Sequence, residues 1–156
     1  MRLVVQRVTE ARVSCGDELL AEIEAGALVL AGIASGDTDE VIDRMADKVV
    51  GLRYFEDDDG RTNRSIVDVG GEMIVVSQFT LQADVRHGRR PGFTPAATPV
   101  VAEPLVDRFV ARLRSLGVVV GTGRFGADMQ VALVSDGPFT LVLESDRDLG
   151  APTGRA

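Results

Sequence analysis

Short apolar segments rich in valine recur along the whole sequence, and residues that favour turns separate them. Apolar runs of about four to eight residues bounded by Gly, Pro or Asp are typical of β-strands. On this pattern we predict strands over 2–14, 18–24, 27–33, 52–55, 73–81, 118–120, 129–134 and 139–144. Only a few residues join many of these segments, which favours hairpins. We therefore expect a strongly curved or barrel-like sheet that is mainly antiparallel.

The segment 38–52 has the spacing of an amphipathic helix instead. Its apolar residues recur every three or four positions. Asp37, with Glu40 three residues later, resembles a capping box that begins this helix. A second helix is predicted further along the chain, so the fold class is α/β, with two helices packed on the sheet.

The second helix is predicted between Thr98 and Gly117, again with its apolar residues on one face. Thr98 followed by Pro99 is a typical start, and Gly117 is a typical end. Pro104 lies inside the segment, where proline disturbs a helix. Either the first turn is irregular or the helix begins near Glu103.

The length of the chain, 156 residues, suits one domain with its own core. We expect this domain over 1–144 and a loose tail over 145–156. The one cysteine, Cys15, cannot form an internal disulfide, which suits a reducing compartment. No apolar run is long enough to span a bilayer, and charge interrupts the start too early for a signal peptide. By elimination we expect a cytoplasmic protein with no membrane partner.

The charge of the chain limits its partners. A formal net charge of −7 argues against sequence-independent coating of nucleic acids, and we expect no DNA partner. A local basic stretch, Arg86-His87-Gly88-Arg89-Arg90, runs against this balance. Most basic runs are solvated surface, but Arg86, Arg89 and Arg90 are the candidates for contacts with phosphates.

The scarcity of histidine and cysteine excludes several kinds of catalytic site. With one residue of each type, no His/Cys metal cluster can form, and we expect neither a metal nor a cofactor. A Ser-His-Asp triad would have to use His87, which lies among arginines in a polar loop. We interpret His87 as a surface residue.

Residues 121–126 (Gly-Thr-Gly-Arg-Phe-Gly) spell the G-x-G-x-x-G pattern of dinucleotide-binding loops. That pattern needs a helix after it, whereas the following segment, 129–134, is short and rich in valine. We therefore interpret 121–126 as a loop. A nucleotide-binding module that uses this loop without hydrolysis is the alternative function.

Two further segments each have a functional and a structural interpretation. Ser77-Gln78-Phe79-Thr80 ends the strongest predicted strand and leads into a long polar loop, 82–98. Its hydroxyl, amide and backbone N–H groups could line a pocket, or it could be an ordinary edge strand. Asp136-Gly137-Pro138-Phe139 reads first as a hairpin turn.

These segments, together with others and in this order, resemble the D-aminoacyl-tRNA deacylase family. The matching strings are 5–8 (Val-Gln-Arg-Val), 70–71 (Gly-Gly), 75–81 (VVSQFTL), 90–93 (Arg-Pro-Gly-Phe), 121–131 and 136–138. Each string alone is modest, whereas the ordered set, which spans most of 1–144, is specific.

The resemblance implies a homodimer with a curved sheet and helices packed outside it. It implies an enzyme that hydrolyses the ester joining a D-amino acid to the 3′ end of tRNA. Glycine is also a substrate on this reading, including glycyl groups mischarged on tRNA-Ala. Four residues match the family's catalytic motif: Ser77, Gln78, Phe79 and Thr80.

The resemblance also assigns residues to substrate selection. Gly137 and Pro138 match a cross-subunit motif, in which a cis peptide of one subunit enters the partner's site and rejects L-aminoacyl groups. Arg7 matches a residue that helps to hold this motif, and Phe125 and Met129 match positions near the terminal adenine.

The sequence bears on how such an ester is cleaved. No base adjoins Thr80, so attack by its hydroxyl lacks an activating partner. A vicinal ribose hydroxyl of the tRNA can help to activate water instead, while backbone N–H groups hold the ester. We expect this ribose-assisted route.

Overall fold

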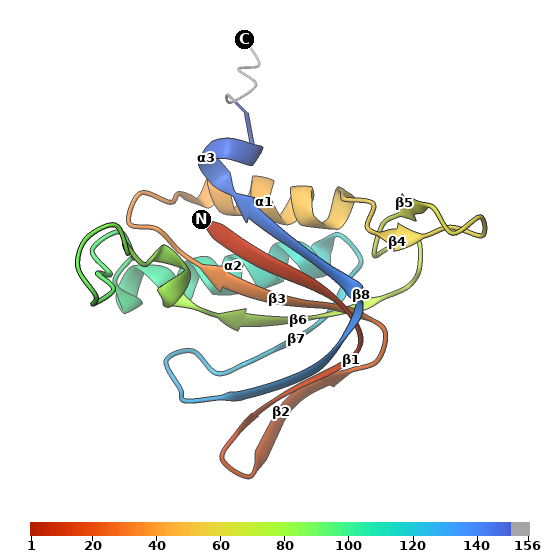
Figure 1. Cartoon of the computed structure of the whole chain (residues 1–156), viewed down its shortest axis with the longest axis horizontal. Helices are drawn as coiled ribbons and strands as arrows, with labels where there is room; N and C mark the ends of the chain where they lie inside the picture. The colour runs from red at the N-terminus through yellow and green to blue at the C-terminus, as the bar shows by residue number, and fades with distance from the viewer. Residues whose placement is uncertain (151–156) are drawn as a thin grey trace.

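The computed structural model describes residues 1–150, and a sheet of long, bent strands dominates it (Figure 1). The strands of this sheet are β1 (Arg2–Cys15), β2 (Glu18–Ile23), β3 (Gly26–Gly32), β6 (Glu72–Ser77), β7 (Val119–Thr122) and β8 (Gln130–Glu144). One edge of β1 pairs with β8 along nearly its whole length, while the other edge pairs first with β3 and then with β2. Because β1 and β8 continue from one half of the sheet into the other, the sheet curls into a partly closed barrel.

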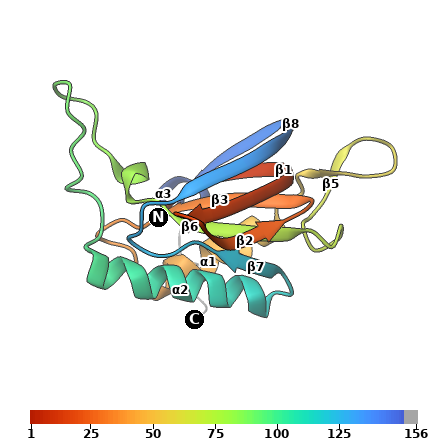
Figure 2. The same ribbon diagram turned by 90° about the horizontal axis from the view of Figure 1, so that it is seen from below.

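Two long helices cover one face of this sheet (Figure 2). The remaining elements are α1 (Asp39–Gly51), the hairpin of β4 (Phe55–Glu56) and β5 (Thr62–Arg64), the 3₁₀ turn η1 (Phe79–Gln82), α2 (Pro99–Ser115) and α3 (Ser145–Asp148). The connections through α1 and α2 make β3, β6 and β7 parallel. The expected α/β class, curved sheet and packed helices are confirmed, and the sheet is mixed.

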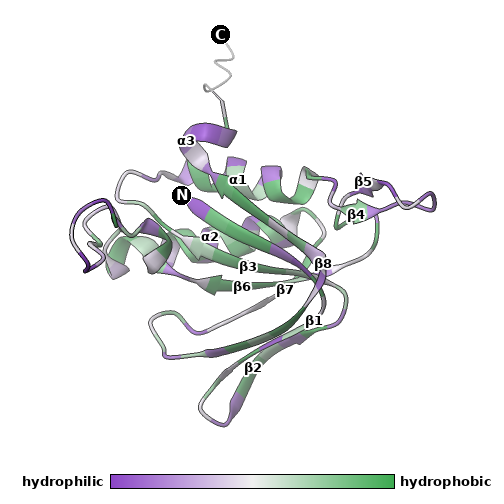
Figure 3. Ribbon diagram, viewed as in Figure 1, coloured by the Kyte–Doolittle hydropathy of each residue, from purple (hydrophilic) through white to green (hydrophobic). Residues whose placement is uncertain are grey.

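Apolar side chains fill the space between the helices and the sheet. Ile42 and Met45 of α1 and Phe109 and Leu113 of α2 are fully buried there. Each such side chain contributes roughly 1.5–3 kcal/mol when it leaves water. Figure 3 shows the strands mainly hydrophobic, whereas the protruding loops near η1 and β5 are hydrophilic. The apolar core therefore holds the helices on the sheet, and the hydrophilic loops lie outside it.

The predicted hairpin turn at 136–139 is wrong. β8 is one strand, and both of its halves pair antiparallel with β1. Gln6 pairs with Thr140 and Val8 pairs with Ser135, so residues 136–139 lie opposite Arg7 alone. We call residues 136–139 the β8 bulge. Glycine and proline mark bulges as well as turns, which is why the sequence did not separate the two.

The strongest predicted strand, 73–81, is too long. β6 ends at Ser77, and Phe79–Gln82 turn away as η1. The predicted strand 52–55 is also reduced, because only Phe55, followed by Glu56, pairs with β5. Apolar residues follow the end of β6 and precede the start of β4, so the apolar pattern alone did not mark these boundaries.

Helix α1 begins one residue later than the predicted capping box. Thr38 is the N-cap, and its hydroxyl accepts a hydrogen bond from the Val41 N–H at 3.4 Å. The Asp37 carboxylate instead accepts a hydrogen bond from the Ala34 N–H at 2.7 Å and pairs with the Met1 ammonium. Asp37 therefore ties the N-terminus to the start of α1.

Helix α2 runs without a break from Pro99 through Pro104, which excludes a start near Glu103. Pro104 cannot donate a hydrogen bond to the Val100 carbonyl. Val100 is 85% exposed, so water can satisfy that carbonyl. At the start of the helix, the Thr98 carbonyl accepts hydrogen bonds from the N–H groups of both Val101 and Ala102.

The segment after β8 is more ordered than the predicted loose tail. Ser145–Asp148 form α3, and the Ser145 N–H donates to the Met1 carbonyl at 2.9 Å. The Met1 ammonium in turn donates to the Ser145 hydroxyl at 2.8 Å. The rest of the predicted tail, 151–156, lies outside the described residues.

Candidate active site

A cavity of about 570 Å³ opens where β6 ends, and we call it the pocket. Ser77, Gln78 and Phe79 line it from the end of β6 and the start of η1. Its other walls come from the end of β3, the loop 83–98, the start of α2 and the loop 123–129. Ligands of α/β sheets commonly bind beyond the carboxyl ends of parallel strands, and β3 and β6 both end here.

Hydrogen bonds hold η1 tightly against the end of β3. The Gln78 N–H donates to the Ala31 carbonyl at 2.8 Å, and the Gln82 side-chain amide donates to the Gly32 carbonyl at 2.8 Å. A Cβ atom on Gly32 would lie 2.8 Å from both the Gln78 carbonyl oxygen and the Leu81 Cβ. Only glycine therefore allows η1 to approach so closely, and this contact fixes the backbone beside the pocket.

Thr80 lies in η1 but does not line the pocket. Its hydroxyl accepts a hydrogen bond from the Gln78 side-chain amide at 2.5 Å. An amide cannot take up a proton as a carboxylate or imidazole can. Among residues 1–150, neither a carboxylate nor the imidazole hydrogen-bonds to the Thr80 hydroxyl.

Phe125 and Met129 line the opposite wall of the pocket, on loop 123–129. Both are half-buried, and each packs against one of the apolar clusters. The Met129 sulfur accepts a hydrogen bond from the Arg124 N–H at 3.2 Å, and the Arg124 side chain pairs with Glu18 at 2.7 Å. As predicted, no helix follows Gly126, since β8 begins at Gln130.

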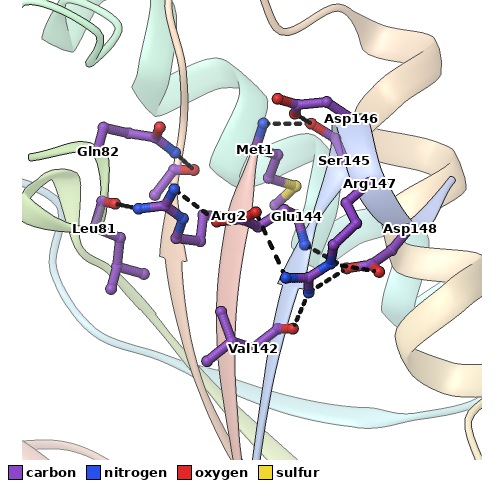
Figure 4. A network of polar contacts seen from close by, with 11 residues as sticks. Met1, Arg2, Leu81, Gln82, Val142, Glu144, Ser145, Asp146, Arg147 and Asp148 are labelled. Atoms are coloured by element: carbon purple, nitrogen blue, oxygen red, sulfur yellow. Dashed lines mark hydrogen bonds and ion pairs between the residues drawn. The ribbon is translucent and has the colours of Figure 1, made fainter. Parts of the chain in front are cut away.

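The start of β1 ties η1 to the end of β8 (Figure 4). The Arg2 guanidinium donates to the Leu81 carbonyl at 2.6 Å and pairs with Glu144 at 2.6 Å. Arg147 also approaches Glu144, at 3.6 Å, and donates to the Val142 carbonyl. Of these cations only Arg2 reaches η1, so it is the link between this network and the pocket.

Arg7 is buried beneath the β8 bulge and is only 6% exposed. Its Nε donates to the Asp136 carbonyl at 3.3 Å and pairs with the Asp136 carboxylate at 3.0 Å. Its Nη1 donates to the Tyr54 carbonyl at 2.9 Å, and its guanidinium lies 5.0 Å from the centre of the Phe139 ring. The Gly137-Pro138 peptide within the bulge is cis.

Within one chain the β8 bulge and the pocket are apart. Arg7 pairs with Ala27, whereas Ser77 pairs with Ala31, four residues further along β3. That spacing is about 13 Å along the strand, and β1 and β3 separate β8 from β6. Gly137 and Pro138 do not line the pocket of their own chain. The predicted site residues thus form two groups.

The predicted phosphate contacts all lie in the exposed part of loop 83–98. Arg86 already binds Asp84 through two hydrogen bonds of 2.9 and 2.7 Å, and this pairing lowers the pKa of Asp84 to about 2. Arg89 and Arg90 have no carboxylate within salt-bridge distance among the described residues. His87 is exposed, as expected of a surface residue.

Sequence reasoning gave no role to three residues that the structure places at these sites. Phe93 and Asp128 line the pocket, and the Tyr54 carbonyl helps to hold Arg7. Asp128 follows the Gly-rich string directly, so that string was a usable signal for it. Tyr54 acts through its backbone, which no sequence pattern reveals. Burial raises the pKa of the Tyr54 hydroxyl.

The sequences of known proteins identify the family. A sequence model described as D-Tyr-tRNA(Tyr) deacylase matches residues 4–144. The chain belongs to the D-aminoacyl-tRNA deacylase family. A D-aminoacyl-tRNA deacylase of Roseiflexus sp. (strain RS-1) is 57% identical over 145 residues, covering 93% of this chain and 94% of that protein. One of Chlorobaculum parvum is 57% identical over 148 residues, covering 94% and 99%.

Solved structures are similar to this chain over most of its length. The structure of a protein named c-Myc DNA Unwinding Element Binding Protein aligns with a TM-score of 0.88 and 41% identity, over 92% of this chain and 98% of that one. A probable eukaryotic D-amino acid tRNA deacylase aligns with a TM-score of 0.79 at 19% identity, over 91% and 97%, and shows the same fold. As a member of the deacylase family, the chain is a hydrolase.

Two general features complete the description of this deacylase. No helix within residues 1–150 has both the length and the apolar character to cross a membrane. In the same range, His, Cys, Asp and Glu side chains form no group of three or more that could hold a metal ion.

Proposed function

We propose that this chain hydrolyses the ester that joins a D-amino acid or glycine to the 3′ adenosine of tRNA, including glycyl groups mischarged on tRNA-Ala. The observation that carries this proposal is the pocket, which Ser77-Gln78-Phe79 and loop 123–129 line from opposite sides. In the family resemblance these are the catalytic and adenosine-binding segments. Their convergence from distant parts of the chain is what one site for an aminoacyl-adenosine requires.

The adenine base is proposed to lie between Phe125 and Met129, and the ester beside η1. Aromatic rings and polarizable sulfur suit the flat face of a base. At the other wall, Phe79 and Thr80 begin η1, and the first N–H groups of a helical turn lack partners inside it. Such N–H groups can stabilise the negative charge that develops on the ester carbonyl oxygen.

The tRNA ribose is proposed to activate water. The vicinal hydroxyl assists a water molecule, the water oxygen bonds to the ester carbon, and the bond from that carbon to the ribose oxygen breaks. The ribose oxygen leaves with a proton, which gives free tRNA and the free amino acid. The engagement of the Thr80 hydroxyl by Gln78, an amide without basic character, supports this route over attack by threonine.

Rejection of L-aminoacyl groups is proposed to come from a second copy of the chain. In a homodimer the Gly137-Pro138 segment of one subunit would enter the partner's pocket and occupy the direction that an L side chain takes. The separation of the β8 bulge from the pocket in one chain supports this arrangement. The hydrogen bonds from buried Arg7 give the segment a firm base. Exclusion by a steric clash can exceed the discrimination that pocket fit alone provides.

Incubation of the protein with D-Tyr-tRNA and L-Tyr-tRNA tests the proposal. We expect rapid loss of the D ester and none of the L ester beyond the uncatalysed rate. A nucleotide-binding module or a purely structural dimer would leave both esters intact, and so would a protein that only binds DNA, the ligand in the name of one structurally similar protein. Hydrolysis of both esters at equal rates would remove the chirality claim.

The choice between water and threonine needs its own variants. Thr80→Ala and Thr80→Ser are compared on D-Tyr-tRNA after circular dichroism confirms that both are folded. We expect substantial turnover from both, because the reacting hydroxyl belongs to the tRNA. Complete loss in Thr80→Ala with activity kept in Thr80→Ser would make threonine the nucleophile.

A further inference from the structure

Two exposed phenylalanine rings stand at the mouth of the pocket. Phe79 of η1 is 57% exposed and Phe93 of loop 83–98 is 38% exposed, and both line the cavity. Their ring centres are 5.0 Å apart and their planes are inclined by 66°. This edge-to-face pair orders the rings and still leaves aromatic surface open to solvent. An ordered and exposed pair of this kind offers a platform for a flat ligand.

The proposed substrate continues past the pocket. A cavity of about 570 Å³ has the size of a site for one small ligand, such as an aminoacyl nucleoside. The nucleotides before the terminal adenosine must therefore lie outside it. Phe125 and Met129, proposed for the terminal adenine, are half-buried, whereas Phe79 and Phe93 are more exposed. The aromatic pair is therefore the more solvent-exposed part of the pocket wall.

The charge around the pair suits an RNA strand. Arg89 and Arg90 lie four and three residues before Phe93 and are exposed, with no carboxylate partner among the described residues. Arg86 holds Asp84, the acidic side chain of this loop, so little negative charge remains free there. Figure 2 shows that loop 83–98 projects away from the sheet, which leaves it accessible to a strand of RNA. Exposed aromatic rings beside cations are the usual means of binding single-stranded nucleic acid.

We propose that the rings of Phe79 and Phe93 form a stacking subsite for the penultimate base of the tRNA 3′ strand. The subsite rests on the proposed function, and it adds recognition of a second nucleotide. The backbone of Phe79 stays with the ester, and its ring serves the neighbouring base.

The test compares D-tyrosyl esters of adenosine, of the trinucleotide CpCpA, and of a CpCpA analogue with an abasic penultimate residue. The analogue keeps both phosphates and lacks only the base. For the wild-type protein we expect KM to be roughly tenfold lower for CpCpA than for the abasic analogue, because base–aromatic stacking has about this strength. Phe93→Leu should lose this difference, and Phe93→Tyr should keep it.

Val67→Ala is the matched control, since Val67 is 46% exposed and precedes β6 at the end opposite the pocket. It should retain the full dependence on the penultimate base. An equal KM for CpCpA and the abasic analogue in the wild-type protein would overturn the subsite while leaving the hydrolytic function intact. The proposal would also be overturned if Phe93→Leu changed the oligomeric state but kept the KM difference between CpCpA and the abasic analogue. The aromatic pair would then belong to a contact between subunits. Absence of hydrolysis of every ester, including D-Tyr-tRNA, would instead reject the proposed function.

Discussion

Arg7 is the residue on which the geometry of the β8 bulge depends most directly. A cation at 6% exposure needs partners in every direction, and Arg7 finds them in Asp136, the Tyr54 carbonyl and the Phe139 ring. Removal of such a partner from a buried carbonyl costs about 1–3 kcal/mol. The resemblance assigned Arg7 to this role from a four-residue string, and its contacts with Asp136 and Phe139 support that proposal.

Gly137 is the residue at which the role of the β8 bulge can be tested. Its φ is +120°, and a Cβ atom there would lie 3.2 Å from an Arg7 guanidinium nitrogen. Gly137→Ala should therefore shift the bulge and either abolish turnover of D-Tyr-tRNA or admit L-Tyr-tRNA. The measurement is kcat/KM on both substrates.

Gly117→Ala is the control for Gly137→Ala, because Gly117 also has a positive φ, of +91°, but nothing lies within 4 Å of its Cβ position. It should lower stability by about 1–3 kcal/mol and leave D/L selectivity as in the wild type. Equal selectivity in the wild type, Gly117→Ala and Gly137→Ala would refute the role of the bulge.

Asp128 is the candidate for a general base supplied by the protein. Among the described residues, it is the one carboxylate that lines the pocket. A general base typically contributes about 100-fold to 10,000-fold in rate. If the tRNA ribose activates water, Asp128→Asn should change kcat on D-Tyr-tRNA by far less than this. A loss of about 100-fold or more, with the fold intact, would move the base from the substrate to the protein.

Among the elements, η1 matters most for the chemistry, and Arg2 fixes it from outside. Arg2 donates to the Leu81 carbonyl and pairs with Glu144. Without it, the backbone N–H groups at the start of η1 lose a constraint, and small displacements of reacting groups cost up to about 100-fold in rate. Arg2→Ala should therefore lower kcat roughly 10-fold or more with little change in KM, and Arg2→Lys should restore part of it.

Arg147→Ala separates this positioning effect from general destabilisation. Arg147 approaches the same Glu144 but does not touch η1. It should lower the melting temperature slightly and leave kcat unchanged. Equal losses of kcat in Arg2→Ala and Arg147→Ala, in step with stability, would show that Arg2 acts only through the fold.

At the level of elements, the sequence predicted most strands and both long helices and missed the places where the chain departs from regular structure. The β8 bulge was read as a hairpin, because Gly137-Pro138 carries the same signal for both. The end of β6 was missed because Phe79 and Leu81 continue the apolar pattern into η1. These departures depend on tertiary contacts, with Arg7 in one case and with Gly32 in the other.

For the whole molecule, the distribution of charge predicts which part of the surface binds tRNA. The net charge is −7, so attraction must come from a local patch. Arg89 and Arg90 are free of carboxylate partners among the described residues, whereas Arg86 is held by Asp84. Joint Arg89→Glu and Arg90→Glu should weaken tRNA binding and flatten its dependence on salt, by about 0.7 in logarithmic slope for each phosphate that is no longer neutralised.

Arg86→Glu is the comparison within the same loop, and its effect on the salt slope should be smaller. Filter binding from low to moderate salt gives both slopes. If all three substitutions change the salt slope of tRNA binding equally, the pairing with Asp84 does not decide which arginines contact phosphates.

The proposed site residues are of two kinds. Some lie in short sequence strings that indicate them, and others would reach the pocket only when two copies of the chain assemble. The pocket residues of β6 and loop 123–129 fall into the first class, because each lies within a recognisable string. Gly137 and Pro138 fall into the second, because they lie away from the pocket of their own chain. The proposed site therefore depends on a second copy of the chain.

Complementation between inactive variants measures this dependence directly. Ala127→Trp fills the pocket, and Gly137→Val disrupts the β8 bulge. The test uses this pair once each variant alone has proved inactive on D-Tyr-tRNA. After the two are mixed and allowed to exchange subunits, about half of the dimers pair an intact pocket with an intact bulge from the partner. We predict the return of roughly a quarter of wild-type activity. No return of activity, with exchange of subunits confirmed by mass spectrometry, would contradict a site completed by the partner.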